Sequence, residues 1–257
     1  ILIDPARDKV AVDDEPLKLE REYAGPRIYI VMNKPKHVFS TNVAQGEQTR
    51  AIDLLPPNFP RVYPVGRLDA ESKGLLLLTN DGELTNKLTH PRYGVAKTYR
   101  AIVDGYVRGA DLDDLKHGIW LADPRKGKGF KTGRSHITIL KRNKHGSTLE
   151  IIIREGRNRQ IRRMLAKIGH KVRDLTRVKM GPLTLHNLAP GQFRPLTKRE
   201  LHELMKMPKE HQPSTHDDRH ALPSNRPETA RPASGRPEPR GQRRRRAHHH
   251  DRDGYRG

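Results

Sequence analysis

One carboxylate in this chain stands where folding alone does not explain it. Asp69 follows Arg67 at a glycine-flanked bend and comes just before the apolar run 75–78. Acidic side chains normally stay solvated, so an aspartate beside a buried strand needs a partner or a chemical role. Covalent catalysis by a carboxylate needs an ionised group in a dry site, and a neighbouring arginine favours the charged form. Asp69 is therefore a candidate nucleophile, and the alternative is a turn aspartate that accepts a backbone N–H.

Two further segments could complete a site around this carboxylate. The segment 155–163, Glu-Gly-Arg-Asn-Arg-Gln-Ile-Arg-Arg, is basic and could supply a buried cation as a partner for Asp69. Tyr99 follows Lys97-Thr98 on an expected strand, where its ring could stack on a nucleic-acid base. An acid, a cation and an aromatic ring together suit chemistry on a nucleotide.

Other kinds of site have no sequence support. The chain contains no phosphate-binding Gly-x-x-x-x-Gly-Lys motif, no His-Glu-x-x-His pair and no Gly-x-Ser-x-Gly elbow. It has no cysteine, which excludes thiol chemistry and fits a reducing cytoplasm. No apolar stretch approaches the ~20 residues that span a bilayer. We therefore expect a cytoplasmic protein with no metal, no cofactor and no membrane partner.

The charge of the chain indicates a polyanionic partner. Its 257 residues carry a formal net charge of +21, and so basic a chain attracts nucleic acid. Residues 208–257 hold 12 Lys and Arg against 7 Asp and Glu, whereas residues 1–207 hold 39 against 23. Most of the excess charge thus belongs to the part expected to fold. The segment 208–257 also holds 7 of the 20 prolines and few large apolar residues, so we expect a disordered basic tail.

The expected elements describe an α+β fold. Apolar and alternating runs predict several strands, and residues 144–146 predict a hairpin between two of them. Helices are few and short, and the clearest has Ile161, Met164, Leu165 and Ile168 on one face. Such a chain favours a mixed, mostly antiparallel sheet with flanking short helices. The expected strands are 28–32, 75–78, 98–103, 135–140 and 148–154, and the expected helices are 83–89, 111–117, 157–168 and 198–207.

Five motifs, in order, resemble those of one enzyme family. They are Val-Gly-Arg-Leu-Asp at 65–69, the run 74–82, His-Pro-Arg-Tyr at 90–93, Lys-Thr-Tyr at 97–99, and 155–164 followed by Gly-His at 169–170. Together they resemble the ribosomal RNA pseudouridine synthases, the bacterial 16S and 23S rRNA uridine isomerases. The resemblance covers residues 28–204 and implies the pseudouridine synthase catalytic fold.

The resemblance also implies roles for individual residues. Asp69 would be the nucleophile, Tyr99 would stack on the target uracil and assist proton transfer, and Arg162 would form an ion pair with Asp69, with Arg157 as the alternative. Arg67 would lie against the RNA and fill the space left by a flipped nucleotide. Lys36-His37 stands where the family commonly has a glycine. The residues expected to bind RNA are Arg67, Lys34, Lys97, Arg157 and Arg159.

The implied reaction breaks the N1–C1′ bond of a uridine and joins C5 to C1′, without a cofactor. The substrate would be ribosomal RNA, free or in pre-ribosomal particles, with 23S favoured over 16S and the enzyme acting as a monomer. A noncatalytic RNA-binding ribosome-assembly factor is the alternative. The implied domains are the end of an S4 RNA-binding domain and a linker (1–24), the catalytic domain (25–207) and the tail (208–257).

Overall fold

The computed structural model describes residues 10–17, 25–44, 46–122 and 129–207. All of these belong to the first of two compact units, Ile1–Pro213. The predicted tail lies outside the described residues, as does most of the segment 1–24. Within that segment β1 (Val10–Val12) and β2 (Glu15–Leu17) pair as an antiparallel hairpin. The S4 assignment of this segment stays a prediction.

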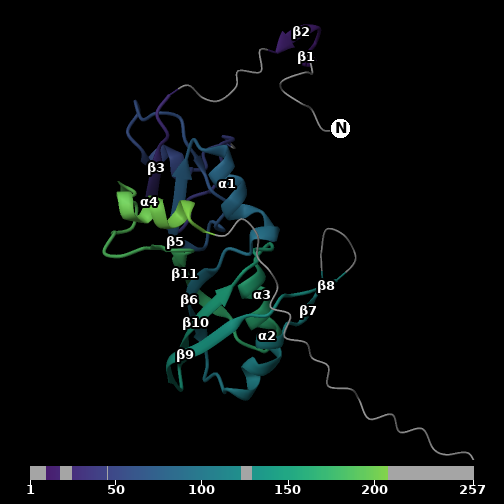
Figure 1. Ribbon diagram of the computed structural model, residues 1–257. Helices are drawn as coiled ribbons and strands as arrows, with labels where there is room; N and C mark the ends of the chain where they lie inside the picture. The colour runs from purple at the N-terminus through teal and green to yellow at the C-terminus, as the bar shows by residue number, and fades with distance from the viewer. Residues whose placement is uncertain (1–9, 18–24, 45, 123–128, 208–257) are drawn as a thin grey trace, which may run out of the picture. The chain divides into compact units, whose positions relative to one another are not determined.

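A mixed sheet forms the centre of the described residues that follow Ala24 (Figure 1). Its strand order is β13-β3-β5-β11-β6-β10-β9, and every neighbouring pair is antiparallel except β5 with β11. This confirms the predicted mostly antiparallel sheet with short helices. The strands are β3 (Tyr29–Lys34), β5 (Lys73–Thr79), β6 (Lys97–Asp104), β9 (His136–Asn143), β10 (Gly146–Ile153), β11 (Val172–Met180) and β13 (Phe193–Pro195), with β4 (Tyr63–Pro64) on β5 and β12 (Leu183–Thr184) on β11.

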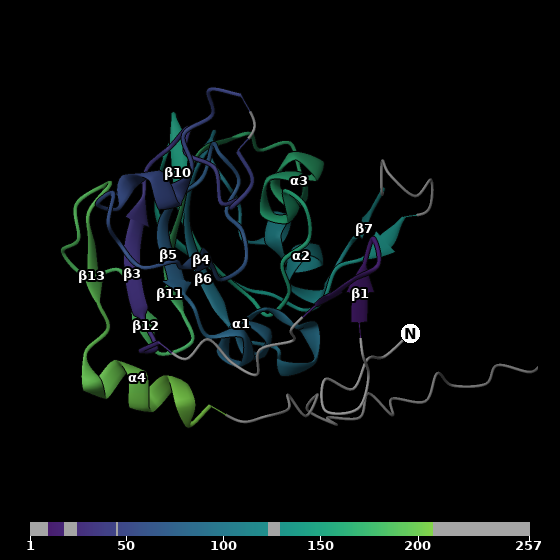
Figure 2. The same ribbon diagram turned by 90° about the horizontal axis from the view of Figure 1, so that it is seen from above.

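In the part of the chain that the structure describes, four short α-helices flank the sheet (Figure 2). They are α1 (Gly82–Thr89), α2 (Asp113–His117), α3 (Gln160–Lys167) and α4 (Lys198–Met205), and single 3₁₀ turns are η1 (Ala51–Leu54), η2 (Pro91–Tyr93) and η3 (Ala110–Leu112). A small separate hairpin joins β7 (Trp120–Leu121) to β8 (Phe130–Lys131). Among the described residues, no helix has the length and apolar character that crossing a bilayer requires.

The run of four leucines in β5 is explained by cores on both faces of the sheet. Leu76 and Leu78 belong to one apolar cluster, with residues of α2 and α3, whereas Leu75 and Leu77 belong to another, with residues of α1 and α4. Neighbouring residues of a strand point to opposite faces, so a strand buried on both sides is apolar throughout. All four side chains are fully buried, and each contributes roughly 1.5–3 kcal/mol.

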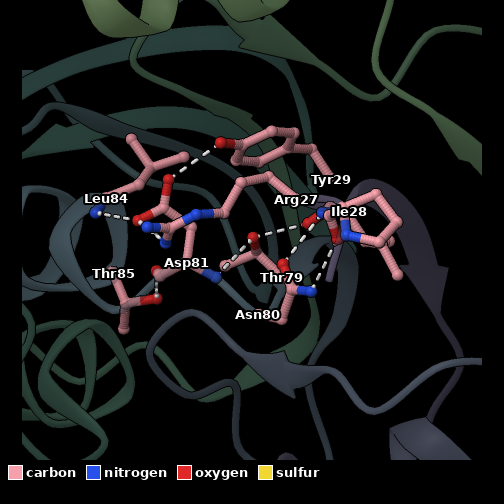
Figure 3. Close-up of polar contacts among 9 residues, drawn as sticks. Arg27, Ile28, Tyr29, Thr79, Asn80, Asp81, Leu84 and Thr85 are labelled. Carbon is pink, nitrogen blue, oxygen red and sulfur yellow. Dashed lines mark hydrogen bonds and ion pairs between the residues drawn. The ribbon is translucent and has the colours of Figure 1, made fainter. Parts of the chain in front are cut away.

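The far end of β5 is fixed to the start of β3 by polar contacts (Figure 3). The buried Asp81 carboxylate caps α1 by accepting from Leu84 N at 3.0 Å, and it also accepts from the Tyr29 hydroxyl at 2.8 Å. Arg27 Nη1 lies 3.2 Å from the same carboxylate. Burial and then Asp81 raise the pKa of Tyr29 to about 12, so its hydroxyl keeps its proton. This cluster holds β5 in place from the end opposite Asp69.

Candidate active site

Asp69 lies in the loop that leads into β5, at one end of the central strand. Its side chain is half-buried. It lines a pocket together with Tyr99, Arg67 and Arg157, and a second, adjoining hollow beside Ser40. The structure therefore brings together the predicted nucleophile, the predicted stacking ring and the three predicted RNA-binding arginines, Arg67, Arg157 and Arg159.

The Asp69 loop is fastened to the chain segment that follows β3. The Ser40 hydroxyl donates to Leu68 O and accepts from Leu68 N, both at 3.3 Å. His37 N donates to Ala70 O at 2.7 Å. His37 has a φ of 64°, in the left-handed region that favours glycine. A glycine would adopt this backbone conformation without strain, and here His37 adopts it.

Tyr99 reaches the site from the neighbouring part of the sheet. It lies on β6, where its side chain is only 7% exposed. The register of the sheet pairs Tyr99 with Arg177 of β11, and pairs Arg177 in turn with Gly74 of β5. Directly paired residues on adjacent strands project from the same face. The central strands therefore set Tyr99 and Arg177 side by side. Gly74, the β5 partner of Arg177, comes five residues after Asp69 in the chain.

Arg177 is a site residue that the sequence reasoning missed. It is 2% exposed, and its Nε donates to Leu75 O at 2.7 Å, but its Nη2 has no hydrogen-bond partner among the described residues. It lines a pocket with Tyr99, Lys97 and Arg67. A buried cation with an unused donor is costly unless an anion meets it. The signal in the sequence was its place in the alternating strand 172–180, two residues after the buried Leu175.

Lys34 lies inside the protein, so the prediction that it binds RNA is wrong. Its side chain is fully buried, and its Nζ donates to Pro35 O at 2.8 Å and to Val38 O at 2.7 Å. The pKa of Lys34 is lowered to about 8, mainly by burial. The negative charge of Asp69 raises this pKa, and the positive charge of Arg177 lowers it. Lys34 is thus a buried cation whose charge acts on Asp69 from within the fold.

The lowered pKa of Lys34 predicts a pH-dependent stability. In the unfolded chain its pKa is the ordinary 10.5, against about 8 when folded, so the unfolded state binds more protons between these values. The penalty for burying the charged lysine is full below pH 8 and disappears towards pH 10.5. The free energy of unfolding of the wild type, minus that of Lys34→Met, should therefore rise across this window in urea titrations. A difference that stays flat with pH would refute this account.

Arg162 does not form the predicted ion pair with Asp69. No contact within 4.0 Å joins the two side chains, both of which lie in the described part of the chain. Arg162 Nη2 instead donates to Glu71 O at 3.1 Å and to Ser72 Oγ at 3.4 Å, and its Nη1 donates to Val172 O at 3.2 Å. Arg162 therefore ties the Asp69 loop to β11.

The displacement of Arg162 follows from where α3 begins. The prediction placed the helix at 157–168, but α3 starts at Gln160 because Arg159 has a left-handed φ of 49°. Arg159 Nη2 lies 2.8 Å from Glu71 Oε2, which adds a second link between this turn and the Asp69 loop. Arg157, the alternative partner for Asp69, also pairs elsewhere, with its Nε 3.5 Å from Glu155 Oε2.

The mouth of the pocket is basic. Arg67, Arg157 and Arg159 are all exposed around it, as the prediction of RNA contacts requires. Lys97 is half-buried in the adjoining pocket, where its Nζ donates to Val95 O at 3.2 Å. Burial and then Arg177 lower the pKa of Lys97 to about 8. The arrangement therefore offers a carboxylate and an aromatic ring at the base of a cleft that attracts phosphate groups.

Comparison with known proteins agrees with this reading of the cleft. The sequence pattern of the family described as RNA pseudouridylate synthase matches residues 28–167. The chain belongs to this family, and it is an isomerase that acts on RNA.

Some of the similar proteins have names that specify the kind of RNA. The chain is 40% identical to the ribosomal large subunit pseudouridine synthase B of Bacillus subtilis, over 73% of this chain and 74% of that protein. It is 40% identical to the ribosomal large subunit pseudouridine synthase E of Vibrio parahaemolyticus, over 65% and 73%. An RNA pseudouridine synthase of Aquifex aeolicus whose role is uncharacterised is 39% identical, over 80% and 79%. A crystal structure of a pseudouridylate synthase superposes with a TM-score of 0.62 at 29% identity, covering 79% of this chain and 83% of the other.

Proposed function

We propose that this protein converts a uridine of ribosomal RNA to pseudouridine, with Asp69 as the nucleophile and 23S rRNA as the substrate. The observation that carries the proposal is the pocket that Asp69 and Tyr99 share beneath exposed arginines. Two relatives that are 40% identical are named for the large ribosomal subunit, which supports 23S over 16S. We further propose that it acts as a monomer in the cytoplasm.

Each residue has a part in this scheme. The target uridine leaves its stack and enters the pocket, where Tyr99 packs against the uracil and Arg67 takes the vacated place. Asp69 acts at the nucleoside, either by attack on C1′ or by removing a proton. The N1–C1′ bond breaks, the uracil turns, and C5 bonds to C1′ while its proton leaves and N1 gains one. The buried cations Lys34 and Arg177 keep negative charge favourable beneath the pocket.

A noncatalytic RNA-binding factor is a poorer explanation of the same cleft. Such a protein would gain nothing from a carboxylate that faces the RNA phosphates and repels them. Nor would it need a tyrosine that is 7% exposed at the base of a pocket.

The test is to map pseudouridine across ribosomal RNA from cells with and without this protein. We expect one position in 23S rRNA to lose its modification, and the purified protein to restore it on a 23S transcript. A loss confined to 16S rRNA would support the alternative substrate. If no ribosomal position changed and neither transcript were modified, the proposal would fail.

The links through Arg162 predict a separation of catalysis from binding. Arg162→Ala frees Glu71 O and Ser72 Oγ, so the Asp69 loop loses its link to β11 and holds Asp69 less firmly, while the exposed arginines remain. Small misplacement of a catalytic group costs on the order of 100-fold in rate. We expect a loss of that size in the single-turnover rate at saturating RNA, with the Kd for RNA nearly unchanged and partial rescue by Arg162→Lys. Arg199→Ala, which breaks an exposed pair with Glu203, is the control and should change neither quantity. A fall in affinity with an unchanged rate would contradict the positioning role.

A further inference from the structure

The pocket that Lys97 and Arg177 line, hereafter the basic pocket, carries an excess of positive charge. Its volume is about 380 Å³, which lies within the usual range of ligand-binding pockets. The described residues that line it include five cations and one acid, Glu155, and Asp69 is not among them. The cations are Arg67, Lys97, Arg154, Arg157 and Arg177. The basic pocket is therefore distinct from the pocket of Asp69, and its charge suits an anion.

The one acid of this lining is already engaged. One oxygen of the Glu155 carboxylate accepts from Gly133 N at 2.7 Å and from Gln160 Nε2 at 2.5 Å. Its other oxygen lies 3.5 Å from Arg157 Nε. In the part of the chain that the structure describes, no ion pair within 4.0 Å joins an acid to Lys97 or Arg177. The charges of these two residues are thus not neutralised by the protein itself.

Lys97 and Arg177 lie on the same face of the sheet. Lys97 comes two residues before Tyr99 on β6, and Tyr99 is paired with Arg177 of the adjacent β11 (Figure 1). Burial and then the charge of Arg177 lower the pKa of Lys97 to about 8. Lys97 Nζ uses one of its three donors on Val95 O. Two poorly solvated cations that repel each other are unfavourable unless an anion lies between them.

Arg177 has a buried donor without a partner. It is 2% exposed, and its Nε donates to Leu75 O at 2.7 Å, but its Nη2 has no hydrogen-bond partner among the described residues. Buried N–H groups of folded proteins nearly always have one. The buried apolar residues Val65, Leu88 and Met180 belong to the same lining, and such surroundings strengthen an ionic hydrogen bond. An anion in the basic pocket would supply the partner that Nη2 lacks.

The basic pocket adjoins the pocket of Asp69. The residues that line both are Arg67, Tyr99, Gly156 and Arg157. A nucleotide whose base packs against Tyr99 beside Asp69 therefore has its sugar–phosphate backbone within reach of the basic pocket. Phosphate groups are the anions of RNA, and contacts to them fix the position of the bases.

We propose that the basic pocket binds a phosphate group of the RNA backbone next to the target uridine, with Arg177 Nη2 and Lys97 Nζ as donors. Arg67 and Arg157 add charge where the two pockets meet. A phosphate held in this way sets how deeply the uridine enters the pocket of Asp69. The proposal rests on the proposed function for the identity of the RNA, whereas binding of a phosphate group needs no chemistry at Asp69.

Inorganic phosphate and the full chain test the basic pocket without any reaction. The lysine side chains are isotope-labelled, and the Lys97 signal is identified by its loss in Lys97→Met. We expect phosphate to shift this signal saturably and to raise the pKa of Lys97 above about 8, because a bound anion favours the charged lysine. Sodium chloride at the same ionic strength is the control for screening and should give no saturable shift. If phosphate acted no differently from chloride, the proposal would be overturned.

Substitution of Lys97 extends the test to RNA. Lys97→Met should weaken the binding of a ribosomal RNA transcript about tenfold, the size of one hydrogen bond to a charged group. It should also reduce the slope of log Kd against log salt by about 0.7, the value for one phosphate contact on a single strand. Lys87→Met is the matched control, because Lys87 is also half-buried and donates to a backbone carbonyl, Met205 O at 2.7 Å, but lines neither pocket. Equal affinity and equal salt slope of the wild type and Lys97→Met would refute the phosphate site.

Arg177→Lys tests the unused donor. The variant keeps a positive charge but loses Nη2, so we expect inorganic phosphate to bind about tenfold more weakly. Urea unfolding shows whether the variant folds, and unchanged phosphate affinity of the folded variant would exclude Arg177 as a donor. Lys97→Met tests the same site at a less buried position, so the outcome does not depend on the folding of Arg177→Lys.

The two proposals fail separately. Phosphate that binds at Lys97 in a protein that leaves ribosomal RNA unmodified would refute the proposed function and support the phosphate site. Modification of ribosomal RNA by a protein in which phosphate has no effect on Lys97 would refute the phosphate site and support the proposed function.

Discussion

Asp69→Asn is expected to abolish pseudouridine formation and to leave the fold and the affinity for RNA nearly intact. Asparagine has the shape of aspartate but neither attacks carbon nor accepts the proton. Loss of a nucleophile in other enzymes costs on the order of 10⁴–10⁶ in rate, which would put the variant below detection. The backbone that holds the loop is unaffected, because the bonds from Ser72 N, Ser40 and His37 involve main-chain atoms of residues 68–70.

The measurement is the single-turnover yield of pseudouridine on a ribosomal RNA transcript, together with urea unfolding and RNA binding. Glu71→Gln is the matched control, because Glu71 is an exposed acid two residues further along the same loop. That control loses the ion pairs of Glu71 with Arg159 and Arg162, but keeps a side-chain oxygen that accepts hydrogen bonds, and it should keep most of the rate. Measurable turnover by purified Asp69→Asn would exclude Asp69 as the nucleophile.

Asp69→Asn should also change the pKa of Lys34. The charge of Asp69 raises the pKa of Lys34 against the effect of burial. Asp69→Asn removes that charge, so the pKa of Lys34 should fall below its value of about 8. Chemical shifts of isotope-labelled lysine, followed through a pH titration, would report the change. An unchanged titration would mean that the two charges are not coupled.

The sequence predicted which residues lie in the candidate site, but it did not predict which hydrogen bonds and ion pairs their side chains form. The motifs predicted that Asp69 and Tyr99 lie in one site, and both residues line the same pocket. The leucine run indicated a buried strand, and the structure buries it on both faces. The role of Arg162 did not follow, because a single left-handed residue, Arg159, moves the start of α3 and so changes what Arg162 faces. Backbone handedness at a non-glycine residue leaves little mark on composition or periodicity.

The buried cations were missed for a related reason. Lysine and arginine are normally exposed, so a sequence read by residue type assigns Lys34 to the RNA surface and overlooks Arg177. Their burial depends on strands distant in the chain, since β3 and β11 both pair with β5. Only the assembled sheet shows that two cations lie beneath the pocket.

Gly74→Ala is expected to destabilise the fold by more than about 4 kcal/mol, the size that marks a severe backbone conflict. Gly74 has a φ of +110°, and a Cβ there would lie 2.8 Å from Arg177 N and closer still to Arg177 O, with which it would clash. These neighbours are backbone atoms of β11, so no side-chain rotation relieves the clash. β5 would have to move away from β11, at the one parallel pairing of the sheet.

The effect should reach the active site as well as the stability. Gly74 is paired with Lys34 on one side and with Arg177 on the other, so its displacement shifts both buried cations relative to Asp69. Urea unfolding gives the loss of stability, and the single-turnover rate of any folded fraction gives the loss of function. Gly109→Ala is the control, because that glycine has no atom within 4 Å of a built Cβ and a helical φ of −58°; it should change stability by less than about 1 kcal/mol. If Gly74→Ala unfolded at the wild-type urea concentration, the close approach of β5 and β11 at Gly74 would not be a requirement of the fold. The glycine is needed because this one pair of strands must come close enough to bring a cation, an aromatic ring and the carboxylate to the same end of the sheet.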